Sequence, residues 1–90
     1  MKQVHLIISG RVQGVYFRAN TRDVARQLGL KGFVRNLSDR RVEVIAQGEV
    51  SELRKLIEFC QKGPPGAEVD DIGITYEEII DKFSGFDVRY

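Results

Sequence analysis

Five stretches of the chain have the residue pattern of β-strands. In the first, Val4, Leu6 and Ile8 alternate with less buried positions. Because successive side chains of a strand point to opposite faces, this alternation gives the strand one firmly buried face. The remaining predicted strands cover residues 31–37, 42–47, a region that opens at Val69 and continues through Tyr76, and a short edge strand over Phe86–Tyr90.

Two stretches between these strands have the period of a helix. Apolar side chains share one face over residues 17–28, and Gly29 suits the position that follows a last helical turn. A second helix is predicted to follow Ser51 as its N-cap and to end at the Gly-Pro-Pro-Gly break of residues 63–66. The apolar stripes are Phe17, Val24, Ala25 and Leu28 in the first helix and Leu53, Leu56, Ile57 and Cys60 in the second.

This order of elements predicts an α+β fold. Strand, helix, strand, strand, helix and strand, followed by a short terminal strand, is the split βαβ or ferredoxin-like plan (βαββαβ). We therefore expect an antiparallel or mixed sheet with two helices on one face, built by residues 1–90 as one domain. The fold hosts many functions, so it does not identify one.

Composition narrows the class of protein. The 14 Lys and Arg residues nearly balance the 13 Asp and Glu residues, giving a net charge of +1. This balance argues against a nucleic-acid coat or a polybasic membrane anchor. A lone cysteine cannot form an internal disulfide, and no signal peptide or membrane-spanning run is visible. We expect a cytoplasmic monomer that binds neither nucleic acid nor a membrane.

The loop before the first helix is the strongest candidate for a functional site. Gly10 and Gly14 bracket it, and Arg18 follows in the first helical turn. Main-chain N–H groups of such a loop, together with a helix N-terminus and a guanidinium, suit a phosphate group. The spacing matches neither a Walker A loop nor a dinucleotide-binding motif, so it does not indicate a nucleotide.

Longer motifs make the interpretation more specific. The run Gly10-Arg-Val-Gln-Gly-Val-Tyr-Phe-Arg18 and the stretch Gly32-Phe-Val-Arg-Asn36 both resemble signatures of the acylphosphatase family. The break at residues 63–67 and the closing pair 89–90 resemble it as well, so the resemblance extends over nearly the whole chain. It implies hydrolysis of a small acyl phosphate to a carboxylate and inorganic phosphate, with phosphate as product and inhibitor and with no cofactor or metal.

The resemblance also implies roles for individual residues. Arg18 would bind the phosphoryl oxygens, and Asn36 would orient the attacking water. Thr21 would support the asparagine or its water, although a helical threonine that bonds to its own backbone is an equal alternative. The phosphate-binding main chain would be that of Gly10, Arg11, Val12, Gln13, Gly14 and Val15.

Three other residues are relevant. Family members often have glycine where this chain has Arg40, in the predicted hairpin turn after Asp39. Arginine with a positive φ there would cost about 1 kcal/mol or somewhat more, unless the turn is of another type. His5 is interpreted as a structural or surface residue without an identified partner, and Cys60 as a small core residue.

Two rival functions stay open. Lys31-Gly32-Phe33 begins like a motif of RNA-recognition domains, but the following residues lack the aromatic side chains on which bases stack. The nearer rival is an acylphosphatase-like module, part of a larger maturation enzyme, that acts on carbamoyl phosphate.

Overall fold

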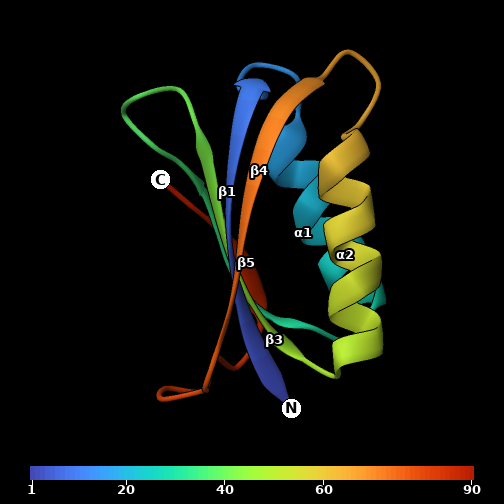
Figure 1. Ribbon diagram of the computed structural model, residues 1–90, viewed down its shortest axis with the longest axis vertical. Helices are drawn as coiled ribbons and strands as arrows, with labels where there is room; N and C mark the ends of the chain where they lie inside the picture. The colour runs from blue at the N-terminus through green and yellow to red at the C-terminus, as the bar shows by residue number, and fades with distance from the viewer.

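A computed structural model describes all 90 residues and contains one five-stranded sheet. The elements are β1 (Lys2–Arg11), α1 (Phe17–Gln27), β2 (Lys31–Asn36), β3 (Val42–Gly48), α2 (Val50–Lys62), β4 (Glu68–Glu77) and β5 (Phe86–Arg89). The strand order is β4-β1-β3-β2-β5, in which all neighbours are antiparallel except β2 and β5. Both helices lie on the same face of the sheet (Figure 1). The predicted ferredoxin-like plan, with a mixed sheet and a terminal edge strand, is confirmed.

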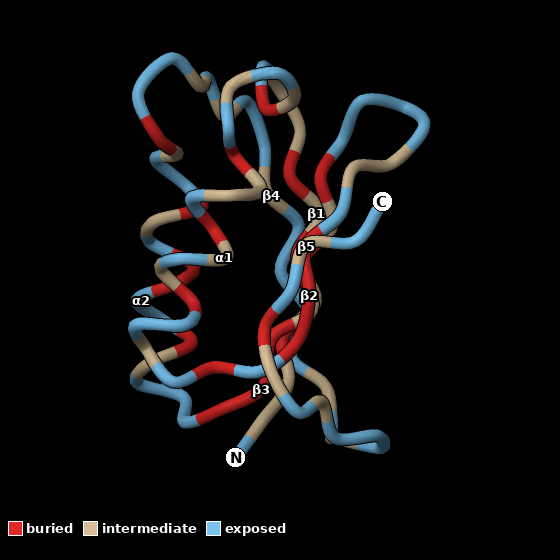
Figure 2. The backbone as a smooth tube through the Cα atoms, turned by 180° about the vertical axis from the view of Figure 1, so that it is seen from behind, coloured by how far each residue is buried: buried red, intermediate tan, exposed pale blue.

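The hydrophobic core fills the layer between the helices and the sheet. Figure 2 shows that the buried positions gather on the inward sides of both layers. Alternation along β1 gives this layer three fully buried side chains, because every second residue faces the helices. The central members of the core are Val4, Leu6, Ile8, Phe17, Ala25, Val34, Val44, Leu53, Leu56, Cys60 and Phe86.

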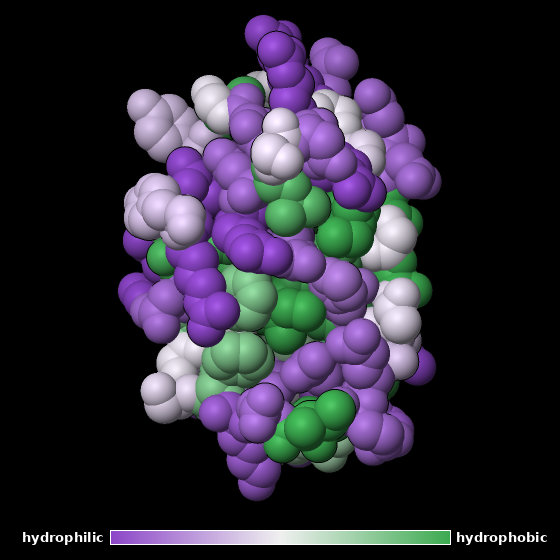
Figure 3. Space-filling view, turned by 90° about the vertical axis from the view of Figure 1, so that its left-hand side faces the viewer, coloured by the Kyte–Doolittle hydropathy of each residue, from purple (hydrophilic) through white to green (hydrophobic).

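The opposite face of the sheet carries no helix. Figure 3 shows apolar side chains near the middle of this face, with polar side chains around them. Here His5 Nε2 lies 2.8 Å from Glu43 Oε2, and Arg35 donates to Glu43 Oε1 at 2.5 Å. Burial of Glu43 opposes its ionisation, but the hydrogen bonds from Arg35 and His5 outweigh burial and hold the pKa of the carboxyl below its ordinary value. His5 is therefore structural, with a partner that the sequence did not reveal.

The helix boundaries agree with the sequence except at one cap. Gly29 follows Leu28, the C-cap of α1, and has a φ of 72°, as expected for the residue after a helix C-cap. The prediction that Ser51 is the N-cap of α2 is wrong. Glu49 is the N-cap, because its carbonyl accepts the Glu52 and Leu53 amides and so starts the helix before Ser51. Neither helix is long and apolar enough to cross a membrane.

Three connections come together at one end of the molecule. The β1–α1 loop, the β2–β3 hairpin and the α2–β4 loop all lie at the top of Figure 1. Because β1 and β2 are both antiparallel to β3, they run in the same direction, so the N-terminus of α1 lies at the same end as the last residue of β2. The fold therefore brings together both segments that carry the candidate site residues.

The β2–β3 hairpin has a three-residue loop, Ser38-Asp39-Arg40. Leu37 N–H donates to the Arg41 carbonyl at 2.8 Å, and Arg40 N–H donates to the Leu37 carbonyl at 3.2 Å. Arg40 has a φ of 74°, in the left-handed region that this type of loop requires at its last position. The strained arginine expected from the sequence is therefore present, and the hairpin does not use another turn.

Replacing Arg40 with glycine should stabilise the protein. The change removes about 1–2 kcal/mol of left-handed strain, against about 0.5–1 kcal/mol of added chain entropy in the unfolded state. We expect the free energy of unfolding in urea to rise by about 1 kcal/mol. Ser38→Gly is the matched control, because Ser38 has no positive φ, and it should lower stability by about 0.5–1 kcal/mol. An equal decrease in the free energy of unfolding in both variants would contradict backbone strain at Arg40.

Candidate functional site

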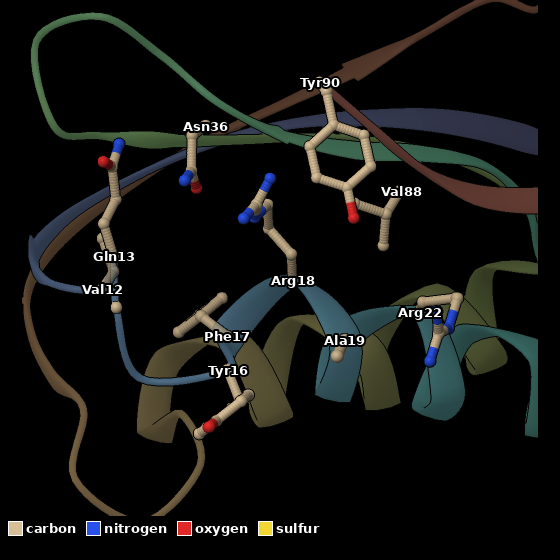
Figure 4. A pocket seen from close by; sticks show the side chains of 11 residues that line it. Val12, Gln13, Tyr16, Phe17, Arg18, Ala19, Arg22, Asn36, Val88 and Tyr90 are labelled. Carbon is tan, nitrogen blue, oxygen red and sulfur yellow. The ribbon is translucent and has the colours of Figure 1, made fainter.

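A pocket of about 390 Å³ opens at the N-terminus of α1. Its walls come from the β1–α1 loop, the first turns of α1, the end of β2 and the end of β5 (Figure 4). The lining residues are Val12, Gln13, Gly14, Tyr16, Phe17, Arg18, Ala19, Arg22, Asn36, Val88 and Tyr90.

The β1–α1 loop has two left-handed residues, Gly14 with a φ of 75° and Tyr16 with a φ of 60°. Alternation of left-handed and ordinary residues curls the main chain into a concave turn in which successive N–H groups can converge on an anion. A β-bulge between Ser9 and Gly10 starts this turn. A side chain at Gly10 would lie 2.2 Å from the Glu68 carbonyl oxygen, so only glycine fits the bulge.

The start of α1 is favourable for an anion. Tyr16 is the N-cap and makes no side-chain capping bond, and no acidic residue occupies the first turn. The first N–H groups of a helix have no partner within the helix, and they carry the positive end of its dipole. This helix end is therefore free to bind a negative group in the pocket.

Arg18 carries the unpaired positive charge of the pocket. Its side chain rises from the first turn of α1 into the centre of the cavity (Figure 4). The guanidinium forms no ion pair with any carboxylate of the protein. It lies 4.9 Å from the centre of the Tyr90 ring, a cation–π contact that leaves its N–H groups available to a ligand.

Asn36 faces Arg18 from the end of β2. Val34 is fully buried against the helices, so Asn36, two residues on, faces the same side of the sheet. Asn36 lies beside the start of α1, so its side chain enters the pocket, and Figure 4 shows its carboxamide directed toward Arg18. The Asn36 Oδ1 atom is buried and has no hydrogen-bond partner. A buried acceptor without a partner is costly, which indicates a place for a ligand or a water molecule.

The C-terminal strand completes the pocket wall. Phe86 is in the core, and Val88 and Tyr90 follow on the same side of β5. Arg26 of α1 donates to the Phe86 carbonyl at 2.9 Å and lies 3.3 Å from the Asp87 carboxylate, which fastens the strand to the helix. This contact helps to explain how an exposed terminal tyrosine comes to lie over Arg18.

The structure brings five of the predicted site residues to the pocket. Val12, Gln13 and Gly14 line it on the loop side, where the Gln13 side chain lies beside Asn36, and both Asn36 and Arg18 face the cavity (Figure 4). The other three loop residues flank it without lining it. Gly10 and Arg11 pair with β4, and Val15 packs against the core.

Thr21 is buried away from the pocket lining. Its hydroxyl makes no hydrogen bond, so the alternative of a bond to its own helix is not realised. It lies near the thiol of Cys60, which is itself fully buried in the core as predicted. Burial raises the pKa of that thiol to about 12, although the Thr21 hydroxyl opposes the shift. Cys60 therefore stays protonated and is not a nucleophile.

Sequence reasoning did not identify the roles of Tyr90, Val88 and Arg22 in the pocket. The only signal for Tyr90 was the closing Arg-Tyr pair. Among the lining side chains there is no carboxylate, imidazole or thiol, and the two cationic side chains are the arginines of α1, Arg18 and Arg22. No group of three or more His, Cys, Asp or Glu side chains is arranged to hold a metal ion. The charge of the two arginines makes the lining suited to a negative group.

Comparison with known proteins identifies the family. The family model described as "Acylphosphatase" matches residues 4–88. The chain belongs to the acylphosphatase family. It is accordingly a hydrolase of acyl phosphates, which yields a carboxylate and inorganic phosphate.

Individual acylphosphatases show how complete the similarity is. The chain is 41% identical over 88 residues to the acylphosphatase of Pelotomaculum thermopropionicum, covering 98% of this chain and 96% of that protein. The crystal structure of acylphosphatase from Bacillus subtilis superposes with a TM-score of 0.96 at 36% identity, with all of both chains covered. The chain also resembles part of HypF from T. kodakarensis, at 30% identity and a TM-score of 0.86, but covers only 12% of that chain.

The Tyr90 contact predicts a small, specific effect on anion binding in this acylphosphatase. An exposed cation–π contact contributes about 0.5–1 kcal/mol, so Tyr90→Leu should raise the inhibition constant of inorganic phosphate about two- to fivefold. We expect kcat to change less than about twofold. Tyr76→Leu removes another exposed tyrosine, on β4, and should change neither constant. An unchanged inhibition constant in Tyr90→Leu would show that the ring does not hold Arg18 in place.

Proposed function

We propose that this acylphosphatase holds the phosphoryl group of its substrate with Arg18 and the main chain of residues 10–15, and aims a water molecule with Asn36. The observation that carries the proposal is the arrangement across one pocket. An unpaired guanidinium and a buried, unpartnered amide oxygen face each other there, with no acidic side chain in the lining.

The leaving group explains why so few residues suffice. A carboxylate leaves as a stable anion, because the pKa of its conjugate acid is about 4–5. The P–O bond can therefore break without a general acid. What remains for the protein is to hold the phosphoryl group, stabilise its charge in the transition state and place the attacking water in line.

Arg18 and the loop perform the first two tasks. The guanidinium stays charged at any working pH and can donate two parallel hydrogen bonds to phosphoryl oxygens. The loop N–H groups and the start of α1 add further donors in fixed positions. Such donors stabilise the transition state without rearranging, and they also bind the phosphate product.

Asn36 performs the third task. Its Oδ1 atom can accept a hydrogen bond from the attacking water, which satisfies the buried acceptor. An amide is too weak a base to take the proton, and no lining residue is a better one. We propose that an oxygen of the phosphoryl group takes it, so that water and the acyl phosphate dianion give a carboxylate and dihydrogen phosphate.

Other parts of the proposal concern the whole protein. We propose that residues 1–90 act as one domain and as a monomer, on a small acyl phosphate and without a metal. Thr21 lies behind the site on α1, and we assign it a supporting role through the packing of that helix.

The assignment predicts different kinetic effects for the two residues, with benzoyl phosphate as substrate and EDTA present. Arg18→Ala should lower kcat/KM about 10²–10³-fold and also raise the inhibition constant of inorganic phosphate, because the guanidinium binds ground state and transition state alike. Asn36→Ala should lower kcat about 10²-fold and change the phosphate inhibition constant less than about threefold, because it removes only water placement.

Arg22→Ala is the matched control. Arg22 lines the same pocket one helical turn after Arg18, but it forms an ion pair with Asp23 at 3.1 Å. We expect its kcat/KM to stay within about threefold of the unmodified protein. Wild-type turnover in Asn36→Ala would rule out its assigned role, and loss of activity on addition of EDTA would rule out metal independence.

A further inference from the structure

Gln13 links the two segments that carry the site. Its side-chain Nε2 donates to the Leu37 carbonyl at 3.0 Å and to the Arg41 carbonyl at 3.0 Å. The donor belongs to the β1–α1 loop, and both acceptors belong to the base of the β2–β3 hairpin. One carboxamide therefore spans the gap between the loop and the hairpin.

The two acceptors lie next to Asn36. Leu37 follows Asn36 directly, and Arg41 precedes Val42, the residue that pairs with Asn36 across the β2–β3 ladder. The Arg41 carbonyl also accepts the Leu37 N–H at 2.8 Å, so the Gln13 bonds join the hydrogen bond that closes the hairpin. In Figure 4 the Gln13 side chain rises from the loop beside Asn36.

No other hydrogen bond joins these segments. The ladder between β1 and β3 ends at the pair Ile8 and Val42, before the loop begins. Beyond that pair, residues 12–16 make no further hydrogen bond to residues 37–41. The two Gln13 bonds are therefore the hydrogen-bonding link between the β1–α1 loop and the base of the hairpin that carries Asn36.

We propose that Gln13 is a positioning residue for the reaction, acting through Asn36. Its role rests on the proposed function, because it fixes the loop that holds the phosphoryl group relative to the carboxamide that aims the water. Displacement of a reacting group by about 1 Å can cost about 10²-fold in rate. Loss of the two hydrogen bonds should therefore reduce kcat and leave the affinity for inorganic phosphate nearly unchanged.

A double-mutant cycle with Gln13→Met and Asn36→Ala tests this role. Methionine has a length similar to glutamine but no N–H donor, so it keeps the packing and removes both bonds. Benzoyl phosphate kinetics and the phosphate inhibition constant are measured for the two single variants, the double variant and the unmodified protein. Gln61→Met, at an exposed position on α2, is the control and should match the unmodified protein.

The positioning role predicts a non-additive result. Gln13→Met should lower kcat about tenfold and leave the phosphate inhibition constant within about threefold of that of the unmodified protein. When Asn36 is already alanine, the same change should lower kcat less than about twofold. Three results would overturn the role of Gln13 alone. They are an equal loss of kcat with and without the Asn36 side chain, an unchanged kcat in Gln13→Met, and a phosphate inhibition constant that rises as much as kcat falls. Full turnover in Asn36→Ala by itself overturns the proposed function, and the role of Gln13 with it.

Discussion

The site depends on a positive charge that the protein leaves without a negative partner. Arg26, Arg35 and Arg41 each form an ion pair with a carboxylate. Arg18 has none, and it lies in the first turn of α1, where the helix dipole is itself positive. A cation at a helix N-terminus typically costs about 0.3–1 kcal/mol. Under the proposed function, a bound phosphoryl group would remove this repulsion, and the stability lost in the empty site would become affinity for the anion.

The sheet determines which side chains meet that charge. Because strand side chains alternate, the face that supplies Val34 and Phe86 to the core also supplies Asn36 and Val88 to the pocket. Inward-facing residues of the sheet belong to the core where a helix covers them and to the pocket where no helix does. At that boundary the sheet extends beyond the N-terminus of α1, and its next inward-facing residues meet the pocket.

Much of this arrangement could be predicted from the sequence. The period of two in β1 and the helical stripes identified the elements. The glycine loop followed by Arg18 indicated an anion site, which stays a prediction. Asn36 came from a resemblance to a family, since an asparagine at a strand end is ordinary in itself. The positive φ of Arg40 was one of two alternatives that the sequence left open, since the family often has glycine there and the hairpin could also have used another turn.

Contacts between distant segments could not be predicted in this way. The two bonds of Gln13 span 24 and 28 residues, and the contact of Tyr90 with Arg18 depends on β5 lying parallel to β2. Neither follows from a local pattern. The N-cap of α2 was misplaced for a local reason. The Glu49 carbonyl accepts the first amides of the helix, although Ser51 is the preferred residue type for an N-cap.

A crystal structure of the protein with inorganic phosphate tests the central claim most directly. The account predicts one phosphate ion in the pocket, about 2.7–3.0 Å from both the Arg18 guanidinium and main-chain N–H groups of residues 11–15. It also predicts a water molecule bonded to the Asn36 carboxamide beside that ion. A phosphate bound elsewhere, loop amides that face away from Arg18, or a carboxamide too far away to share a water with the ion would contradict it.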